Sequence, residues 1–465
     1  MKKGNIVDLN IEKLSYGGLG LARHEDMVIF VKGGIPGQLV KSKIYKKKKK
    51  YLEAYVLEVL EKSKNQTNPN CEHFGICGGC SFQNYNYKDQ LNEKQNQVND
   101  LFSRIAKIES PIINPIIGCK DIYNYRNKME FSYSPNRWIL DLESKNEFET
   151  DDALGLHVKG RFDKIIDIKD CHLHSRNANK IFKYIKQYLI KNKVSSFNIK
   201  ERSGYLKNII IREGYKSNEI LINFITTNND NKKIMELVQN LTNKFECIKS
   251  IINTTIAKNS GSSLGNENLL FGRNYINERI GENLYKISSN SFFQTNTNQA
   301  EILYDTILKI CEFQGNEIVY DLYCGTGSIG IHIAKYVKKV YGVEIVMSAV
   351  IDAIENAKKN NVTNIQFFHG DLIDFFESNQ EVKLIEYPDF IILDPPRAGI
   401  HERTLMNIIK FNPKKIIYVS CNPSTQARDI KILQDNNFMV KEIQPVDMFP
   451  HTPHIENITL LINNG

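Results

Sequence analysis

The feature that most constrains the fold is a regular alternation of apolar, strand-like runs and helical segments after residue 284. The predicted strands are 317–323, 339–344, 365–369, 390–393, 415–420, 439–446 and 455–462. Helices fill most of the intervals, for example at 348–360. Because parallel strands need a crossover connection, normally a helix, this rhythm predicts an α/β domain with a largely parallel, doubly wound sheet covered on both faces.

The first of these strands leads into a glycine-rich turn, Asp-Leu-Tyr-Cys-Gly-Thr-Gly-Ser-Ile-Gly at 321–330. Glycines at this spacing between a strand and a helix let the backbone approach a ligand closely. Glu344 ends the next strand, where its carboxylate can accept hydrogen bonds from ribose hydroxyls. Dehydrogenases that bind nicotinamide cofactors and methyltransferases both use this arrangement, so the glycine-rich turn alone leaves both classes open.

The ends of two later strands favour a methyltransferase of a particular kind. One strand ends in Asp394-Pro-Pro-Arg397, and the next delivers Cys421. Enzymes that methylate amino groups typically carry an aromatic residue where Arg397 stands, so amine methylation is disfavoured. Addition of a thiolate to carbon 6 of a pyrimidine makes carbon 5 nucleophilic, and a base must then remove the proton from carbon 5. Candidate bases cluster at 450–456, and Glu456 begins the last predicted strand; a buried structural thiol is the alternative for Cys421 alone.

The first sixty residues alternate like short strands separated by glycine turns, which predicts a small β-barrel of the oligonucleotide-binding type. Lys41, Lys43 and the unbroken run Lys46 to Lys50 concentrate positive charge there, while the whole chain carries a formal net charge of +8. Such a block neutralises phosphates and releases counterions. The lysines therefore predict RNA binding, with a solvated lysine loop as the alternative.

Three of the nine cysteines, Cys71, Cys77 and Cys80, lie within ten residues, with glycines between them that allow tight turns. Soft thiolate ligands at such spacing suit zinc or an iron–sulfur cluster. The best candidate for a fourth ligand is Cys171. Three thiols without any metal are the remaining alternative.

The length of 465 residues allows two to four domains. We expect a barrel at 1–62, a central α+β domain at 63–284 and the α/β domain at 285–465. A hydrophobic content of 41% with 25% charged residues is typical of a soluble globular protein. The chain has no apolar run of about 18 residues and opens on a polar segment, so we expect a cytoplasmic location, no membrane association and no obligate protein partner.

Five motifs, taken in order, resemble those of the RNA uracil-5-methyltransferases, and the similarity covers essentially the whole chain. The motifs lie at 291–296, 321–330, 394–399, 420–423 and 450–456. The resemblance implies S-adenosylmethionine (SAM) as cofactor, a Rossmann-like catalytic domain, Cys421 as nucleophile and Glu456 as base. It also implies contacts to SAM or to the target base, which fall on Gln294, Tyr323, Glu344, Asp394 and, near the adenine, Asp371. The motifs show no departure from the family pattern.

The outer domains extend the resemblance. The barrel is similar to the TRAM module of RNA-modifying enzymes, and a subset of the family carries a [4Fe–4S] cluster on cysteines arranged like Cys71, Cys77, Cys80 and Cys171. That subset implies 23S ribosomal RNA as the target, and relatives imply that the helix predicted at 87–108 packs on the catalytic domain. The alternatives are a transfer RNA uracil-5-methyltransferase and a non-catalytic iron–sulfur protein that binds RNA or assists ribosome assembly. Cytosine-5 methylation usually needs two catalytic cysteines, and only Cys421 lies at a suitable strand end.

Overall fold

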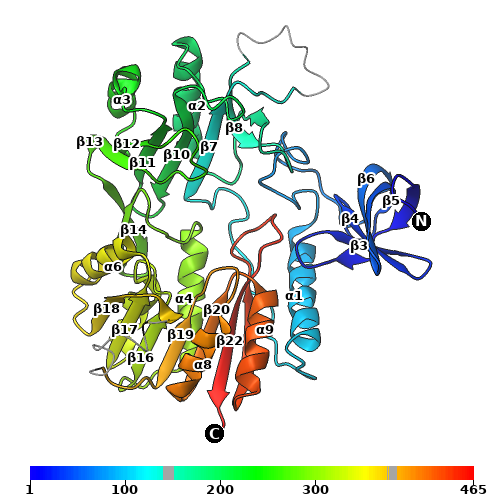
Figure 1. Cartoon of the computed structure of the whole chain (residues 1–465), viewed down its shortest axis with the longest axis vertical. Coiled ribbons are helices and arrows are strands. Elements are labelled where there is room, and N and C mark those ends of the chain that lie inside the picture. The colour runs from blue at the N-terminus through cyan, green and yellow to red at the C-terminus, as the bar shows by residue number, and fades with distance from the viewer. Residues whose placement is uncertain (140–150, 374, 376–384) are drawn as a thin grey trace. The chain divides into compact units, whose positions relative to one another are not determined.

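The computed structural model describes residues 1–139, 151–373, 375 and 385–465 (Figure 1). Contacts between residues divide the chain into two compact units. The first unit comprises Met1–Gly75, Gly79–Ile122 and Pro395–Gly465, and the second comprises Ile76–Gly78 and Tyr123–Asp394. The two ends of the chain therefore fold together in the first unit, while the chain between them forms the second.

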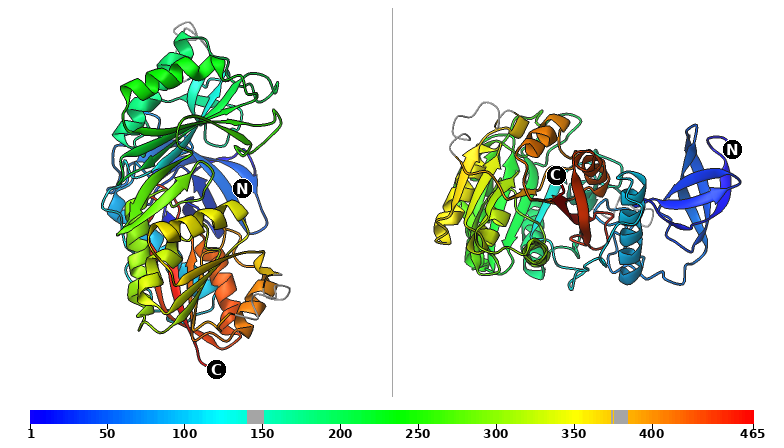
Figure 2. Two further views of the ribbon diagram at one scale, coloured as in Figure 1. Left: turned by 90° about the vertical axis from the view of Figure 1, so that its left-hand side faces the viewer. Right: turned by 90° about the horizontal axis from the view of Figure 1, so that it is seen from below.

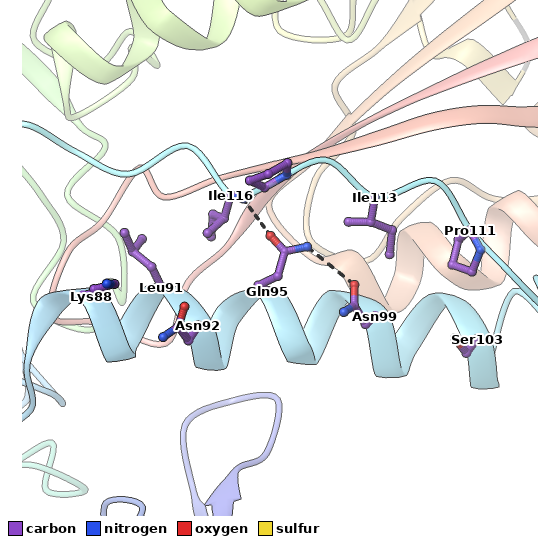
Figure 3. Close-up of a pocket in the computed structure, with 10 residues that line it drawn as sticks. Lys88, Leu91, Asn92, Gln95, Asn99, Ser103, Pro111, Ile113 and Ile116 are labelled. Atoms are coloured by element: carbon purple, nitrogen blue, oxygen red, sulfur yellow. Dashed lines mark hydrogen bonds between the residues drawn. The ribbon is translucent and has the colours of Figure 1, made fainter. Parts of the chain in front are cut away.

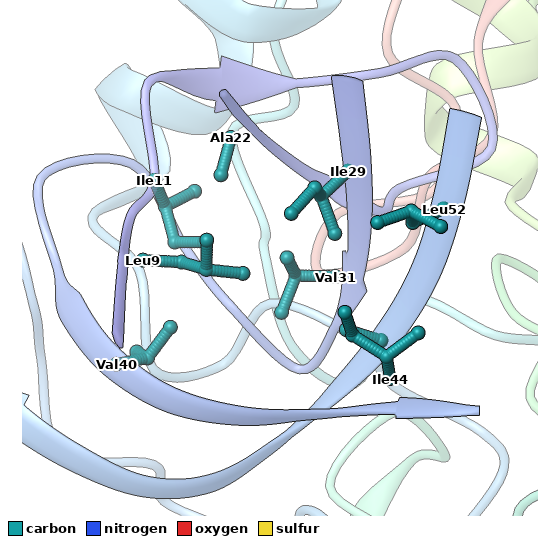
Figure 4. Packing of buried hydrophobic residues seen from close by; sticks show 9 residues of the cluster. Leu9, Ile11, Ala22, Ile29, Val31, Val40, Ile44 and Leu52 are labelled. Atoms are coloured by element: carbon teal, nitrogen blue, oxygen red, sulfur yellow. The ribbon is translucent and has the colours of Figure 1, made fainter. Parts of the chain in front are cut away.

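The N-terminal part of the first unit is a six-stranded sheet with the order β1-β5-β6-β4-β3-β2. Its strands are β1 (Ile6–Asn10), β2 (Lys13–Leu14), β3 (Gly20–His24), β4 (Met27–Lys32), β5 (Leu39–Lys47) and β6 (Tyr51–Glu61). Inward-facing apolar side chains alternate along the strands and meet in one core, so the sheet curls around them (Figure 4). The predicted barrel is thus present.

The lysine run lies at the turn between β5 and β6. Lys46 forms an ion pair with Glu53 (Nζ to Oε1, 2.7 Å), whereas Lys48, Lys49 and Lys50 are exposed. The cluster therefore presents positive charge to solvent at one end of the barrel, as a phosphate-binding surface requires.

The rest of the first unit combines one helix from the N-terminal part of the chain with the C-terminal elements (Figure 1). These elements are α1 (Tyr87–Arg104), α8 (Glu402–Lys410), β20 (Lys415–Ser420), α9 (Pro423–Gln434), β21 (Phe438–Val446) and β22 (Glu456–Asn463). β22 pairs with both β20 and β21, and both pairings are antiparallel. Helix α1 packs against α9.

Helix α1 also carries a buried ion pair that links it to the C-terminal segment. Lys94 Nζ lies 2.7 Å from Asp447 Oδ1, and the two side chains are 2% and 0% exposed. Tyr87 donates its hydroxyl hydrogen to Asp447 Oδ2 at 2.8 Å. Residues 111–116 run along α1 and leave a groove between them (Figure 3), where Gln95 Oε1 accepts from the Ile116 amide at 2.7 Å.

The second unit begins with a seven-stranded mixed sheet in the order β13-β12-β11-β10-β7-β8-β9. Its strands are β7 (Lys128–Ser134), β8 (Ala153–His157), β9 (Ile165–Asp167), β10 (Leu206–Gly214), β11 (Glu219–Thr226), β12 (Ile248–Thr255) and β13 (Asn266–Gly272). Helices α2 (Arg176–Lys191) and α3 (Lys232–Lys244) contact each other and the sheet (Figure 2). The α+β pattern predicted for the central part of the chain is present.

Four parallel strands follow in the second unit, in the order β18-β17-β16-β19. They are preceded by an antiparallel hairpin that the sequence did not predict. The elements are β14 (Tyr275–Ile280), β15 (Asn283–Ser288), α4 (Thr297–Cys311), β16 (Ile318–Leu322), α5 (Ser328–Ile333), β17 (Lys339–Glu344), α6 (Met347–Lys359), β18 (Ile365–His369) and β19 (Phe390–Leu393). A short 3-10 turn at Ala334–Tyr336 follows α5. Among the described residues, no helix combines the length and apolarity needed to cross a bilayer.

The buried Lys94–Asp447 pair gives a stability prediction. Replacing Lys94 by Met leaves the Asp447 carboxylate without its cation, which should lower the free energy of unfolding by about 3–5 kcal/mol. Thermal and urea unfolding followed by circular dichroism measures the change.

The matched control is Lys13→Met, because the ion pair of Lys13 with Asp100 on α1 has the same length, 2.7 Å, but its side chains are 38% and 44% exposed. Loss of that pair should cost about 0–1 kcal/mol. Equal losses in the two variants would contradict the assignment of a buried, coupled pair.

Candidate active site

The carboxyl ends of the four parallel strands meet at one edge of the sheet in the second unit. Their register aligns Leu322 with Val343 and with Leu393, and Glu344 with His369. Tyr323 and Asp394 each come one residue after a strand, Glu344 ends its strand, and Asp371 follows two residues after His369. Four of the five predicted cofactor residues therefore lie along the same edge, which is where open α/β sheets bind ligands.

The glycine-rich turn at this edge has the backbone conformation that its sequence predicts. Tyr323, Gly325 and Gly327 all have positive φ angles, of 64°, 55° and 75°. A Cβ atom on Gly327 would lie 2.6 Å from the ring of Phe367, so only glycine fits there. Helix α5 begins directly after Gly327, and its first amides face the turn.

Glu344 is tied to the glycine-rich turn through its carboxylate. Its Oε2 accepts from the Gly325 amide at 3.0 Å, and its Oε1 accepts from the Val346 amide at 2.9 Å. The backbone carbonyl of Glu344 accepts from the Gly370 amide at 3.0 Å. Because each carboxylate oxygen has two lone pairs, the fixed carboxylate retains acceptor capacity for the hydroxyls of a ligand.

Two further carboxylates lie at the ends of β16 and β19. Burial raises the pKa of Asp321 and of Asp394 to about 7 in each case. Asp321 Oδ2 accepts from the Gly330 amide at 2.9 Å and so closes the glycine-rich turn. Asp321 Oδ1 is buried and makes no hydrogen bond among the residues that the structure describes. An unsatisfied buried acceptor at this position fits a site that a polar ligand completes.

Gln294 and Asp371 are held by local backbone contacts. The Gln294 carbonyl accepts from Asn127 Nδ2 at 2.9 Å, just before Asn296 caps α4 through the Gln299 amide. Asp371 Oδ1 accepts from the Ile373 amide at 2.9 Å. The backbone at Gln294 is thus held by Asn127, while Asp371 makes a local turn contact.

Cys421 and Glu456 belong to the first unit, where antiparallel pairing brings them together. The last ladder pair of β20 and β22 is Ser420 with Asn457. The same register, continued by one residue, sets Cys421 opposite Glu456, and side chains directly opposite each other have Cβ atoms about 4.5–5.5 Å apart. Glu456 is 4% exposed, whereas Cys421 is only partly buried. A thiol and a carboxylate therefore lie next to the last pair of the same ladder.

Asn422 fixes the turn that carries Cys421. Its Oδ1 caps α9 by accepting from the amides of Ser424 and Thr425 at 3.2 and 3.4 Å, and Pro423 occupies the first turn of the helix. Its Nδ2 donates to the Arg397 carbonyl at 2.8 Å. The helix cap therefore positions both the cysteine and the segment that begins at Pro395.

The loop that leads to Glu456 is held by α1. The Gln90 side chain accepts from the His451 amide at 3.0 Å and lies 3.1 Å from His451 Nδ1. Burial lowers the pKa of His451 to about 4, so its imidazole is neutral at pH 7. Lys94 also donates to the Phe449 carbonyl at 3.3 Å. Of the residues at 450–456, Glu456 begins β22 beside the end of β20, while His451 bonds to α1.

The four predicted cluster cysteines are divided between the units. In the first unit, Gln83 joins Cys71 and Cys80, because its Oε1 accepts from the Cys71 amide at 3.1 Å and its Nε2 donates to Cys80 Sγ at 3.2 Å. In the second unit, Cys77 forms a β-bridge with Val158, and Cys171 is buried. Across residues 1–139, 151–373, 375 and 385–465, no group of three His, Cys, Asp or Glu side chains is close enough to hold a metal ion.

One residue near the cysteine was not singled out from the sequence. Tyr16, in the turn between β2 and β3, donates its hydroxyl hydrogen to Asn422 Oδ1 at 2.7 Å. It lies 406 residues earlier in the chain, and no periodicity or motif spacing links the two positions. The only local signal was the glycine pair that follows it.

Comparisons with known proteins show the family to which the chain belongs. Residues 86–464 match the family model described as tRNA (uracil-5-)-methyltransferase, and residues 1–57 match the TRAM domain. An RNA methyltransferase of Bacteroides thetaiotaomicron is 38% identical, with 96% of this chain and 98% of the relative covered. One of Chlorobaculum tepidum is 36% identical, with 98% and 96% covered.

Among solved structures, the chain is similar to the Pyrococcus abyssi tRNA (uracil-54, C5)-methyltransferase in complex with S-adenosyl-L-homocysteine. The TM-score is 0.77 at 27% identity, with 98% of this chain and 100% of that chain covered. Fold and site thus define a SAM-dependent RNA methyltransferase with an N-terminal TRAM domain. More narrowly, the chain belongs to the tRNA (uracil-5-)-methyltransferase family.

The Glu344 carboxylate gives a binding prediction. Glu344→Gln should weaken binding of S-adenosylhomocysteine by about ten- to hundredfold, because a hydrogen bond to a charged acceptor contributes about 1.5–3 kcal/mol. Isothermal titration calorimetry measures the dissociation constant. Glu282→Gln, at a carboxylate whose side chain is 89% exposed, is the control and should bind like the wild type. Unchanged affinity in Glu344→Gln would argue against a ligand contact.

Proposed function

We propose that this enzyme methylates carbon 5 of a specific uridine in 23S ribosomal RNA through a covalent bond between Cys421 and carbon 6. The observation that supports the proposal is the pairing of β20 with β22, whose last pair, Ser420 with Asn457, is directly followed by Cys421 and directly preceded by Glu456. Uracil-5 methylation needs a nucleophile and a base at one face of the ring, and these two side chains meet that need.

Cys421 begins the reaction by adding its thiolate sulfur to carbon 6 of the uracil. A carbon–sulfur bond forms, the C5–C6 double bond breaks, and its electron pair makes carbon 5 nucleophilic. The position of Cys421 just before the N-terminus of α9 favours the thiolate, because the amide dipoles there stabilise negative charge. SAM, when bound, supplies the electrophilic methyl group that carbon 5 acquires.

Glu456 completes the cycle as the base. Its carboxylate takes the proton from carbon 5, the released electron pair restores the C5–C6 double bond, and the sulfur of Cys421 leaves as a thiolate. Burial at 4% exposure keeps bulk water away from the carboxylate. Because Glu456 begins β22, its backbone is fixed by pairing with Val446 on β21.

The residues at the carboxyl edge of the parallel strands suit a SAM site. Glu344 would hold the ribose hydroxyls and Asp371 the adenine, while Gln294, Tyr323 and Asp394 would contact the cofactor or the target base. Positive φ angles in the glycine-rich turn and the unsatisfied Oδ1 of Asp321 support a polar ligand at this edge.

The surface of the TRAM domain is suited to binding RNA. The exposed lysines of the TRAM domain provide phosphate contacts. The target uridine must leave its base stack to reach Cys421, which favours a single-stranded loop or a flipped nucleotide. Resemblance to relatives that carry an iron–sulfur cluster supports 23S ribosomal RNA. The solved relative that acts on transfer RNA makes a transfer RNA uridine the second candidate.

The cysteines at 71, 77, 80 and 171 are proposed ligands of a [4Fe–4S] cluster, supported by the spacing of the first three and by the resemblance to relatives that carry such a cluster. Side chains in the described structure are not arranged as a metal site, so binding would require the thiols to rearrange. Methyl transfer needs no electron, and we assign the cluster no step in the reaction.

The covalent mechanism predicts that Glu456→Gln accumulates a protein–RNA adduct, since the thiolate still adds but the carbon-5 proton is no longer removed. Denaturing electrophoresis after incubation with cellular RNA and SAM detects the adduct, and sequencing of the trapped RNA identifies it. We expect 23S ribosomal RNA.

The double variant that also carries Cys421→Ala should form no adduct, whereas addition of Cys247→Ser, at a partly buried cysteine in the second unit, should leave adduct formation intact. Trapped transfer RNA would favour the second candidate. Absence of any adduct, with RNA modification unchanged in cells that carry only Cys421→Ala, would favour a non-catalytic RNA-binding protein.

The cluster hypothesis predicts about four irons and matching sulfide per chain after anaerobic purification. Cys77→Ser should lose both, and Cys119→Ser, outside the ligand set, should keep them. Metal analysis and acid-labile sulfide assays provide the counts. Zinc in place of iron, or no metal in the wild-type protein, would contradict the [4Fe–4S] proposal.

A further inference from the structure

The turn between β2 and β3 joins the barrel to the catalytic part of the first unit. The Leu14 amide donates to Glu93 Oε2 on α1 at 2.6 Å, and Lys13 forms its ion pair with Asp100 on the same helix. Two polar contacts one residue apart therefore fix the start of this turn on α1.

The tip of the turn approaches the loop that leads to Glu456. Gly18 has a φ angle of 84°, and a Cβ atom there would lie 2.8 Å from Pro453 Cβ and 2.9 Å from the Phe82 ring. Glycine is therefore required for this approach. The turn between β2 and β3 and the loop that leads to Glu456 are thus in direct contact within the first unit.

Tyr16 lies between these two attachments and reaches the turn that carries the nucleophile. Its hydroxyl donates to Asn422 Oδ1 at 2.7 Å, and Asn422 directly follows Cys421. The same oxygen caps α9 through two backbone amides, at 3.2 and 3.4 Å. The helix cap does not depend on the phenol, so the short contact to Tyr16 is an additional link between the barrel and the cysteine turn.

The charges around Tyr16 are those of the proposed active site. Burial raises the pKa of Tyr16 to about 12, with further increases from the charges of Cys421 and Glu456 and an opposing effect from Arg397. The phenol is therefore protonated at neutral pH and acts as a donor. Tyr16 is also 37% exposed, which leaves part of the ring accessible to bound RNA.

We propose that Tyr16 is a positioning residue for the methylation reaction, because its hydrogen bond to Asn422 couples RNA binding by the barrel to the placement of Cys421. This inference rests on the proposed function, in which Cys421 is the nucleophile. It gives the TRAM domain a part in the chemical step in addition to its part in RNA binding.

The test is single-turnover methylation of the RNA identified by trapping, at saturating RNA and SAM. Tyr16→Phe keeps the ring and removes only the donor, so the rate constant should fall about three- to tenfold while the dissociation constant for RNA stays within about twofold. Tyr55→Phe is the matched control, since Tyr55 lies in the same barrel and is also 37% exposed. It should leave the rate constant unchanged. A wild-type rate constant in Tyr16→Phe, or a loss that appears only as weaker RNA binding, would overturn the proposal.

A second measurement needs no RNA and so separates this inference from the proposed function. Alkylation of Cys421 by iodoacetamide, followed by mass spectrometry of the modified peptide, reports the placement and reactivity of the thiol. The alkylation rate constant should differ at least about twofold between Tyr16→Phe and both wild type and Tyr55→Phe, with unchanged thermal stability. Equal rate constants in all three proteins would overturn the positioning role even if no methylated RNA is found.

Discussion

The antiparallel pairing of β20 with β22 is the constraint on which the proposed chemistry depends. A one-residue slip in this ladder would turn every side chain of β22 to the other face of the sheet and move Glu456 away from Cys421. Buried polar contacts hold the register. The Gln426 side chain on α9 donates to the Tyr418 and Asn457 carbonyls and accepts from Asn457 Nδ2. A helix therefore fixes the two strands next to the proposed nucleophile and the proposed base.

In the second unit, the proposed cofactor edge depends on the backbone of the glycine-rich turn. The glycine-rich turn and Glu344 support each other, since the carboxylate accepts from a backbone amide of the turn. The turn then presents backbone groups, which cannot change rotamer, at the ends of the strands. This arrangement explains why glycine spacing and one acidic residue were sufficient to locate the edge from the sequence.

Much of the fold could be predicted because periodicity reports burial directly. The strands at 339–344, 365–369, 390–393 and 415–420 have the predicted bounds, since each is a short, largely apolar segment with polar residues at or beside its ends. Periodicity does not report pairing, so the hairpin of β14 with β15 and the antiparallel direction of β22 had to come from the structure. Likewise, Cys421 and Glu456 could be named from motifs, whereas the contact of Tyr16 with Asn422 depends on tertiary packing that no local pattern encodes.

The construction of the first unit from both ends of the chain affects how the protein folds. Lys94 and Asp447 are 353 residues apart in sequence, and the barrel turn and the cysteine turn are separated even further. During synthesis the barrel and α1 emerge long before the C-terminal elements of the first unit. Contacts between these parts can form only after those elements have been synthesised. Until then the face of α1 that carries Lys94 stays exposed to solvent. The proposed nucleophile and base can therefore come together only after β22 has been synthesised, and a chain that stops before β22 would carry the exposed lysines of the barrel without this pair.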